Sequence, residues 1–148
     1  MKRPHLVLAL LLSVLAAVPS TFGQDLDSVK AEQNPERRAE YALDHAHNML
    51  DTARSLYKEA KYDRFEGAVL EIGDSVQLCQ DSLKATGKDP RKNSKQFKKM
   101  EQRIQLLIRR LKSMESEVSV DDRPVVKKVV ARLEEINEEI VNGIFTKS

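Results

Sequence analysis

Apolar side chains recur in four stretches of similar length, at alternating steps of three and four residues. This spacing places apolar side chains on one face of an α-helix, as in helical bundles. A valine-rich stretch at 125–130 would also suit a strand, but the helical period continues through Ile140 and favours a helix. The pattern predicts helices at about residues 35–60, 64–86, 94–118 and 122–142.

Alanine occupies every first position of the first apolar seam. Small side chains let a neighbouring backbone approach towards the short end of the usual range of about 8–10 Å between helix axes. We therefore expect this helix to pack closely against a neighbour. The seam positions are Ala39, Ala42, Ala46, Met49, Ala53, Leu56 and Ala60.

Polar residues and glycines mark the ends of these helices. Residues 34–36, Asn-Pro-Glu, suit a helix start, because asparagine caps free N–H groups and proline has none to lose in the first turn. Residues 63–66, Asp-Arg-Phe-Glu, match a capping box for the second helix. Asp121 or Asp122 is expected to cap the fourth helix, and Asn142-Gly143 to end it.

The four predicted helices have matched lengths, and the links at 61–63 and 119–122 are short. Short links make consecutive helices antiparallel, so we predict an all-α, up-down-up-down four-helix bundle. Residues 34–146 would form this single domain, preceded by a flexible lead at 24–33. The alternative is an open stack of two long αα-hairpins, which requires two apolar faces on the middle helices.

Residues 53–65, ARSLYKEAKYDRF, resemble the turn between the two helices of a tetratricopeptide repeat. The matching positions are Ala53, Leu56, Tyr57 and Tyr62. Phe65 and Ile72 depart from the family, which has small residues at those places, and no proline closes the unit. The resemblance covers about residues 49–72 and implies a protein-binding surface rather than a reaction.

The N-terminus has the pattern of a secretory signal peptide. Met1-Lys2-Arg3 is positively charged, residues 6–18 are continuously apolar, and residues 21–23 end in glycine. The apolar run is short for a membrane anchor, which needs roughly 20 apolar residues. We predict that residues 1–23 are removed before Gln24 and that the protein is periplasmic or secreted, with no transmembrane segment after cleavage.

Charge is balanced overall but unevenly distributed. The chain carries 25 basic and 23 acidic residues, and the two extra basic residues, Lys2 and Arg3, belong to the leader. The mature chain is therefore neutral, which does not support general nucleic-acid affinity. Residues 84–112 nevertheless contain 11 basic and 2 acidic residues. The basic residues are Lys84, Lys88, Arg91, Lys92, Lys95, Lys98, Lys99, Arg103, Arg109, Arg110 and Lys112.

Two interpretations of this basic segment compete. The acidic second and fourth helices could neutralise it internally, which we favour for 103–112. Alternatively, the loop and the following turn form a patch for an anionic envelope component or an acidic protein. Both interpretations stay open for this patch, whose residues are Lys88, Arg91, Lys92, Lys95, Lys98 and Lys99.

Candidate metal ligands lie on the first helix. Glu40, Asp44, His47 and Asp51 are spaced to share one face, and carboxylates with an imidazole suit a divalent cation such as Zn²⁺. This face lies opposite the alanine seam, so a solvated polar face explains the same residues and is favoured.

The chain lacks the motifs of common active sites. It has no Glu-x-x-His, Cys-x-x-Cys-His, glycine-rich phosphate loop or Gly-x-Ser-x-Gly motif. Its single cysteine, Cys79, lies on an apolar seam and is expected to be a buried structural thiol.

These observations predict an exported, non-catalytic helical bundle without a cofactor. We expect it to act as a protein-binding or scaffolding module in the cell envelope or outside the cell. It would bind a protein partner or itself through helix faces, or an anionic component at the basic end. The alternative is a bundle that binds a metal or small ligand.

Overall fold

The computed structural model describes residues 25–146, which form five helices and no strand. The prediction of an all-helical bundle is confirmed. The helices are α1 (Leu26–Lys30), α2 (Pro35–Lys58), α3 (Tyr62–Ala85), α4 (Ser94–Glu117) and α5 (Arg123–Phe145). The predicted signal peptide lies outside the described residues. Within those residues, no helix is long and apolar enough to cross a membrane.

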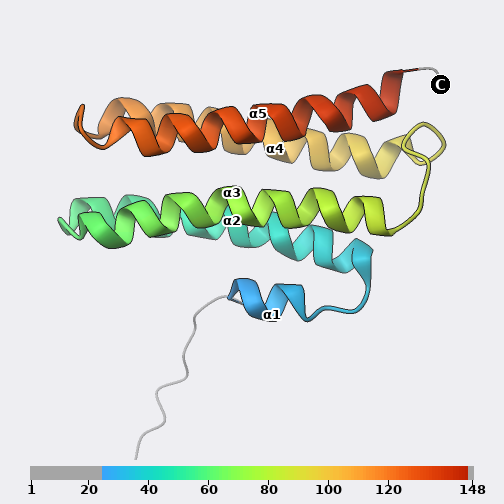
Figure 1. Ribbon diagram of the computed structural model, residues 1–148, viewed down its shortest axis with the longest axis horizontal. Coiled ribbons are helices and arrows are strands. Elements are labelled where there is room, and N and C mark those ends of the chain that lie inside the picture. The colour runs from blue at the N-terminus through green and yellow to red at the C-terminus, as the bar shows by residue number, and fades with distance from the viewer. Residues whose placement is uncertain (1–24, 147–148) are drawn as a thin grey trace, which may run out of the picture.

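The four long helices form two antiparallel hairpins stacked in layers (Figure 1). One layer holds α4 and α5, the next holds α2 and α3, and α1 lies on the outer side of the second layer. The closely packed pairs are α2 with α3, α4 with α5, α3 with α5, and α2 with α4.

The order of the helices around the bundle differs from the simplest up-down-up-down arrangement. Helices α2 and α4 start at the same end of the molecule, so these neighbours run parallel, as do α3 and α5 (Figure 1). The consecutive helices α3 and α4 are not among the closely packed pairs. The cause is the link at 86–93, which is long enough to carry the chain across the end of the bundle.

The apolar stripes of the long helices meet in one core. Ala39, Ala42, Ala46 and Ala53 of the predicted seam are fully buried. Their small side chains allow the backbones of α2 and α3 to lie close together over most of their length. Close packing of the first long helix is thus confirmed.

Ala60, the last predicted seam position, is an exception. It lies beyond the end of α2, is exposed, and has a positive φ of 58°. The N–H of Lys61 donates to the carbonyl of Leu56 (2.9 Å), and the N–H of Ala60 donates to that of Tyr57 (3.0 Å). This is a Schellman turn, which needs one left-handed residue. The turn, and not the heptad repeat, determines the conformation of Ala60.

Of the three predicted helix starts, one is confirmed with its capping bonds, one is confirmed in position only, and one is wrong. Oδ1 of Asn34 caps α2 by accepting from the N–H groups of Glu36 (2.9 Å) and Arg37 (3.2 Å), as predicted. The capping box at 63–66 is wrong, because the Schellman turn leads directly into α3, which begins at Tyr62. Asp122 takes the expected position before α5, but its side chain makes no capping bond there.

The lead before α2 is not a loose segment throughout, because residues 26–30 form α1. Val29 of α1 is 1% exposed and belongs to the core. The guanidinium of Arg38 holds the segment between α1 and α2 against α3. It donates to the Glu32 carbonyl (2.8 Å) and to Oγ of Ser82 on α3 (2.9 Å). A five-residue helix is too short to show periodicity, which is why the sequence pattern did not predict it.

Candidate functional site

The polar face of α2 is partly exposed and forms ion pairs with α4. Lys99 Nζ lies 2.8 Å from Glu40, and the guanidinium of Arg103 contacts both Glu40 (3.3 Å) and Asp44. Further along, Arg110 pairs with Asp51 and donates to His47 Nδ1 (3.0 Å). We call this contact the ionic seam. Its residues are Glu40, Asp44, His47 and Asp51 of α2 and Lys99, Arg103 and Arg110 of α4.

The ionic seam has a regular register. Its contacts join a residue of α2 to a residue either 59 or 63 positions later on α4. The two separations differ by four residues, about one helical turn. A constant offset of this kind requires two parallel helices in fixed register. The side chains of Asp44 and Asp51 are 59% and 64% exposed, as a solvated polar face requires, but the sequence did not anticipate α4 as their neighbour.

The four candidate metal ligands are all part of the ionic seam. Their polar atoms face guanidinium and ammonium groups, which repel a metal cation. Within residues 25–146, no three His, Cys, Asp or Glu side chains are placed to hold a metal ion. The pKa of His47 is lowered from 6.5, first by burial and then by the charges of Arg103 and Arg110. This geometry favours a structural role for the four residues.

The basic segment at 103–112 is largely neutralised inside the protein, as favoured from the sequence. Arg103 and Arg110 pair with α2, and Lys112 pairs with Glu134 of α5. The neighbours differ from the prediction, however. We expected the second and fourth long helices, whereas α4 lies between the first, α2, and the fourth, α5.

The basic patch predicted at the loop and first turn of α4 borders an open groove of about 590 Å³. We call it the lysine groove. It lies between the N-terminal ends of α2 and α4, and Glu36 and Glu40 form its α2 wall. Arg91 and Lys98 of the predicted patch lie outside it. The groove residues from the loop and α4 are Lys88, Lys92, Asn93, Ser94, Lys95, Gln96 and Lys99.

Only part of the positive charge in the lysine groove is neutralised. Lys88 reaches across to Glu36 and Lys99 reaches to Glu40. Lys92 and Lys95 are exposed and make no ion pair with any residue of the described chain. The α4 wall of the groove therefore carries uncompensated positive charge.

The start of α4 adds to this positive potential. Its first turn holds no acidic residue, and the side chain of Asn93 does not cap it. Instead Asn93 Nδ2 donates to the Asp89 carbonyl (3.1 Å). Lysines at a helix N-terminus meet the positive end of the helix dipole, which is unfavourable unless an anion is nearby. The sequence revealed these lysines, but not the acidic wall opposite them.

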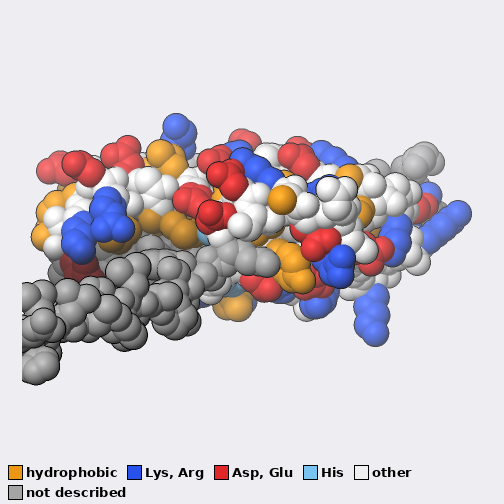
Figure 2. Space-filling model, turned by 90° about the horizontal axis from the view of Figure 1, so that it is seen from below, with side chains coloured by type: hydrophobic (Ala, Val, Ile, Leu, Met, Phe, Trp, Pro, Cys, Tyr) orange, Lys and Arg blue, Asp and Glu red, His pale blue; other side chains and the backbone are white. Residues whose placement is uncertain are grey.

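Charges of both signs are interspersed on the face that carries α1 (Figure 2). Basic side chains also project from its right-hand end, the end where the loop between α3 and α4 lies in Figure 1.

Outside the ionic seam and the lysine groove, the thiol of Cys79 and the imidazole of His45 are buried in the core. Cys79 is fully buried, and burial raises the pKa of its thiol to about 12, so the thiol stays protonated. This agrees with a structural thiol. His45 is also buried, with Nε2 2.7 Å from Oε1 of Glu71 on α3.

Comparison with known proteins finds no relative: no family model, curated protein or solved structure matches this chain. The class of the protein is defined by its fold, an all-α bundle of two stacked hairpins with a basic groove at one end.

Proposed function

We propose that this protein is an exported, non-catalytic binding module and that the lysine groove holds an acidic segment of a protein partner. The N-terminal leader pattern supports export. The observation that carries the binding proposal is the pair of unpaired lysines, Lys92 and Lys95, on the α4 wall of an open groove.

Carboxylates suit this groove for two reasons. They would neutralise lysines that have no internal partner, and they would complement the uncapped positive end of α4. Ion pairs at such an exposed site are individually weak, at about 0–1 kcal/mol each. Affinity therefore requires several carboxylates along one segment, with a marked dependence on salt.

The acidic wall favours a polypeptide over a membrane surface. Glu36 and Glu40 lie within the groove, so a flat anionic bilayer would approach these carboxylates together with the lysines. A peptide can place acidic side chains against the α4 wall and polar or basic side chains against the α2 wall.

The experiment compares a short glutamate-rich peptide with its glutamine-rich counterpart by fluorescence anisotropy at two salt concentrations. We expect only the glutamate peptide to bind, and more weakly at high salt. The double variant Lys92→Glu/Lys95→Glu should weaken this binding by about tenfold or more, equivalent to about 1.4 kcal/mol.

A matched variant, Lys127→Glu/Lys128→Glu on α5, changes the net charge equally at an exposed site outside the groove. It should bind the peptide like the unchanged protein. If both variants weaken peptide binding equally, net charge alone explains the effect, and the proposal is overturned. Binding to phosphatidylserine vesicles that depends on Lys92 and Lys95, without peptide binding, would overturn it in favour of a membrane surface.

A further inference from the structure

A second, smaller cavity lies at the same end of the bundle, between α3, α5 and the start of α4. Its volume is about 180 Å³. The apolar residues that line it are Leu83, Pro90, Phe97, Ile140 and Gly143. Leu83, Phe97 and Ile140 are themselves buried, so these side chains border both the core and the cavity.

The loop between α3 and α4 closes directly onto α5 beside this cavity. A Cβ atom at Gly143 would lie 3.3 Å from Cγ of Pro90, so a larger residue would push the loop away. Glycine is a poor helix former, and at this place it lets Pro90 approach the helix backbone. The cavity is therefore bounded by a fitted contact on one side and is not simply a frayed end of the bundle.

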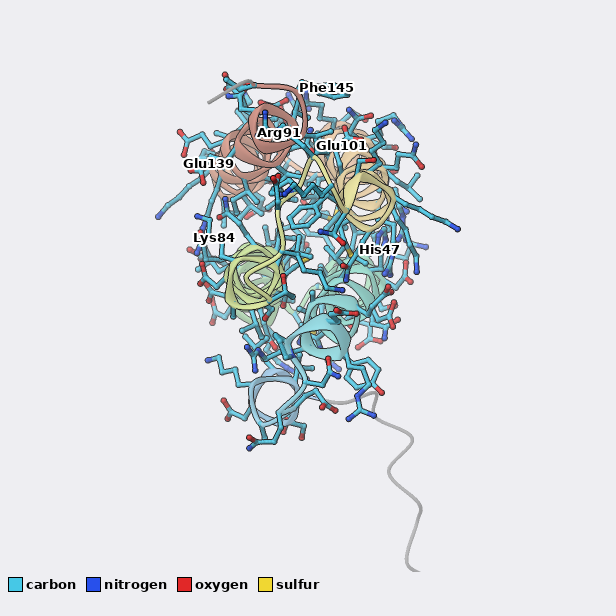
Figure 3. The ribbon with its side chains drawn as sticks, turned by 90° about the vertical axis from the view of Figure 1, so that its right-hand side faces the viewer. His47, Lys84, Arg91, Glu101, Glu139 and Phe145 are labelled. Atoms are coloured by element: carbon cyan, nitrogen blue, oxygen red, sulfur yellow. The ribbon has the colours of Figure 1, made fainter. Side chains whose placement is uncertain are left out.

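Three polar side chains stand at the mouth of the cavity, and two of them, Lys84 and Glu139, project on the same side of the bundle (Figure 3). Gln80, which is 4% exposed, donates from Nε2 to Oε2 of Glu139 (2.5 Å), and Lys84 Nζ lies 3.3 Å from the same oxygen. Oε1 of Glu139 accepts no bond from the described residues. The Glu139 side chain is 62% exposed, so this acceptor is solvated and lies at the edge of an apolar cavity.

We propose that this cavity binds a small apolar molecule, a single aromatic ring that carries one hydrogen-bond donor. For scale, an apolar cavity of about 150 Å³ binds benzene. The ring would lie among Leu83, Phe97 and Ile140, and its hydroxyl or N–H would donate to Oε1 of Glu139. This site shares no residue with the lysine groove, so its test is independent of the function proposed above.

The test titrates phenol and toluene separately into methyl-labelled protein and follows the NMR signals. Phenol should shift the methyl signals of Leu83 and Ile140 and bind roughly three- to tenfold tighter than toluene, the ratio expected for one hydrogen bond. Glu139→Leu should abolish this preference while toluene binding persists. A missing shift at millimolar phenol, or shifts confined to other parts of the protein, would overturn the proposal.

Ile140→Phe fills the cavity and should abolish the binding of both probes. Ile144→Phe makes the same change one turn later on α5, outside the lining, and should leave binding intact. Circular dichroism checks that both variants fold. If one of them does not, a crystal of the unchanged protein soaked with 4-iodophenol replaces it, and iodine density anywhere but beneath Pro90 would contradict the site.

Discussion

The two hairpins have nearly the same dimensions but are packed in different ways. The long helices contain 24, 24, 24 and 23 residues. In the α2/α3 hairpin, many buried positions hold small side chains, whereas every buried residue of α4 and α5 is Val, Leu, Ile, Met or Phe. The small buried residues of the first hairpin are Ala39, Ala42, Ala46, Ala53, Ala68, Gly73, Ser75, Cys79 and Ser82.

This difference shows two physical routes to the same supersecondary structure. In the first hairpin, small residues bring the backbones together and leave little space for extra atoms. In the second, large side chains fill a wider separation. The two hairpins should therefore respond in opposite ways to changes in side-chain volume: enlargement disrupts the first, and truncation disrupts the second.

The largest effect is expected for truncation in the second hairpin. Leu107 is fully buried on α4, and Leu107→Ala should lower the free energy of unfolding by about 2–5 kcal/mol, because a cavity replaces the side chain. Leu106→Ala, at the neighbouring position that is 45% exposed, should cost no more than about 0.5 kcal/mol. Urea denaturation of both variants measures the contrast, and equal losses would contradict it.

Enlargement should affect the first hairpin. Ala46 is fully buried, and Ala46→Leu should lower the free energy of unfolding by about 1–3 kcal/mol, because the added atoms force the helices apart. Ala131 on α5 is exposed, so Ala131→Leu is the control and should be nearly neutral. If chemical denaturation shows that Ala46→Leu is tolerated, the first hairpin is not packed through backbone proximity.

Glycines in α3 offer a finer comparison. A Cβ at Gly67 would meet nothing within 4 Å, so Gly67→Ala should stabilise the protein by about 1 kcal/mol through helix propensity. A Cβ at Gly73 would lie 3.1 Å from the guanidinium of Arg132, which pairs with Asp74. Gly73→Ala should therefore gain less than Gly67→Ala. Thermal melts decide this, and a larger gain at Gly73 would show that the contact with α5 is unimportant.

The smallest effect concerns the ionic seam that joins the hairpins. Because the folded protein lowers the pKa of His47, the neutral imidazole is favoured in the folded state. Its contribution to stability is complete above the usual histidine pKa, about 6.5, and is lost as the pH falls through the lowered folded value. His47→Gln keeps an acceptor for Arg110 and should flatten this part of the curve of Tm against pH. An unchanged slope would show that His47 is not responsible.

Much of the fold follows from local pattern, but several helix ends do not. The cap at Asn34 was predicted because its bonds involve only neighbouring residues. The carboxylate of Asp122 instead accepts from the hydroxyl of Tyr57 on α2.

Ala60 was misassigned because the helix ends in a turn before it. Helix α1 was missed because its one buried residue, Val29, cannot show a helical repeat. The lysines of the groove could be found from the sequence. The position of Glu36 in the opposite wall could not, because it depends on α2 and α4 being neighbours.

The sequence by itself determined that this protein is helical, about how long its four long helices are, and which face of each is buried. Only the tertiary structure decided the order of helices around the core, the pairing of α2 with α4, and which lysines remain without a partner. The physical reason lies in the energies involved. Burial of a continuous apolar face strongly favours a helix, while alternative helix arrangements bury similar faces and differ by ion pairs worth about 0–1 kcal/mol each.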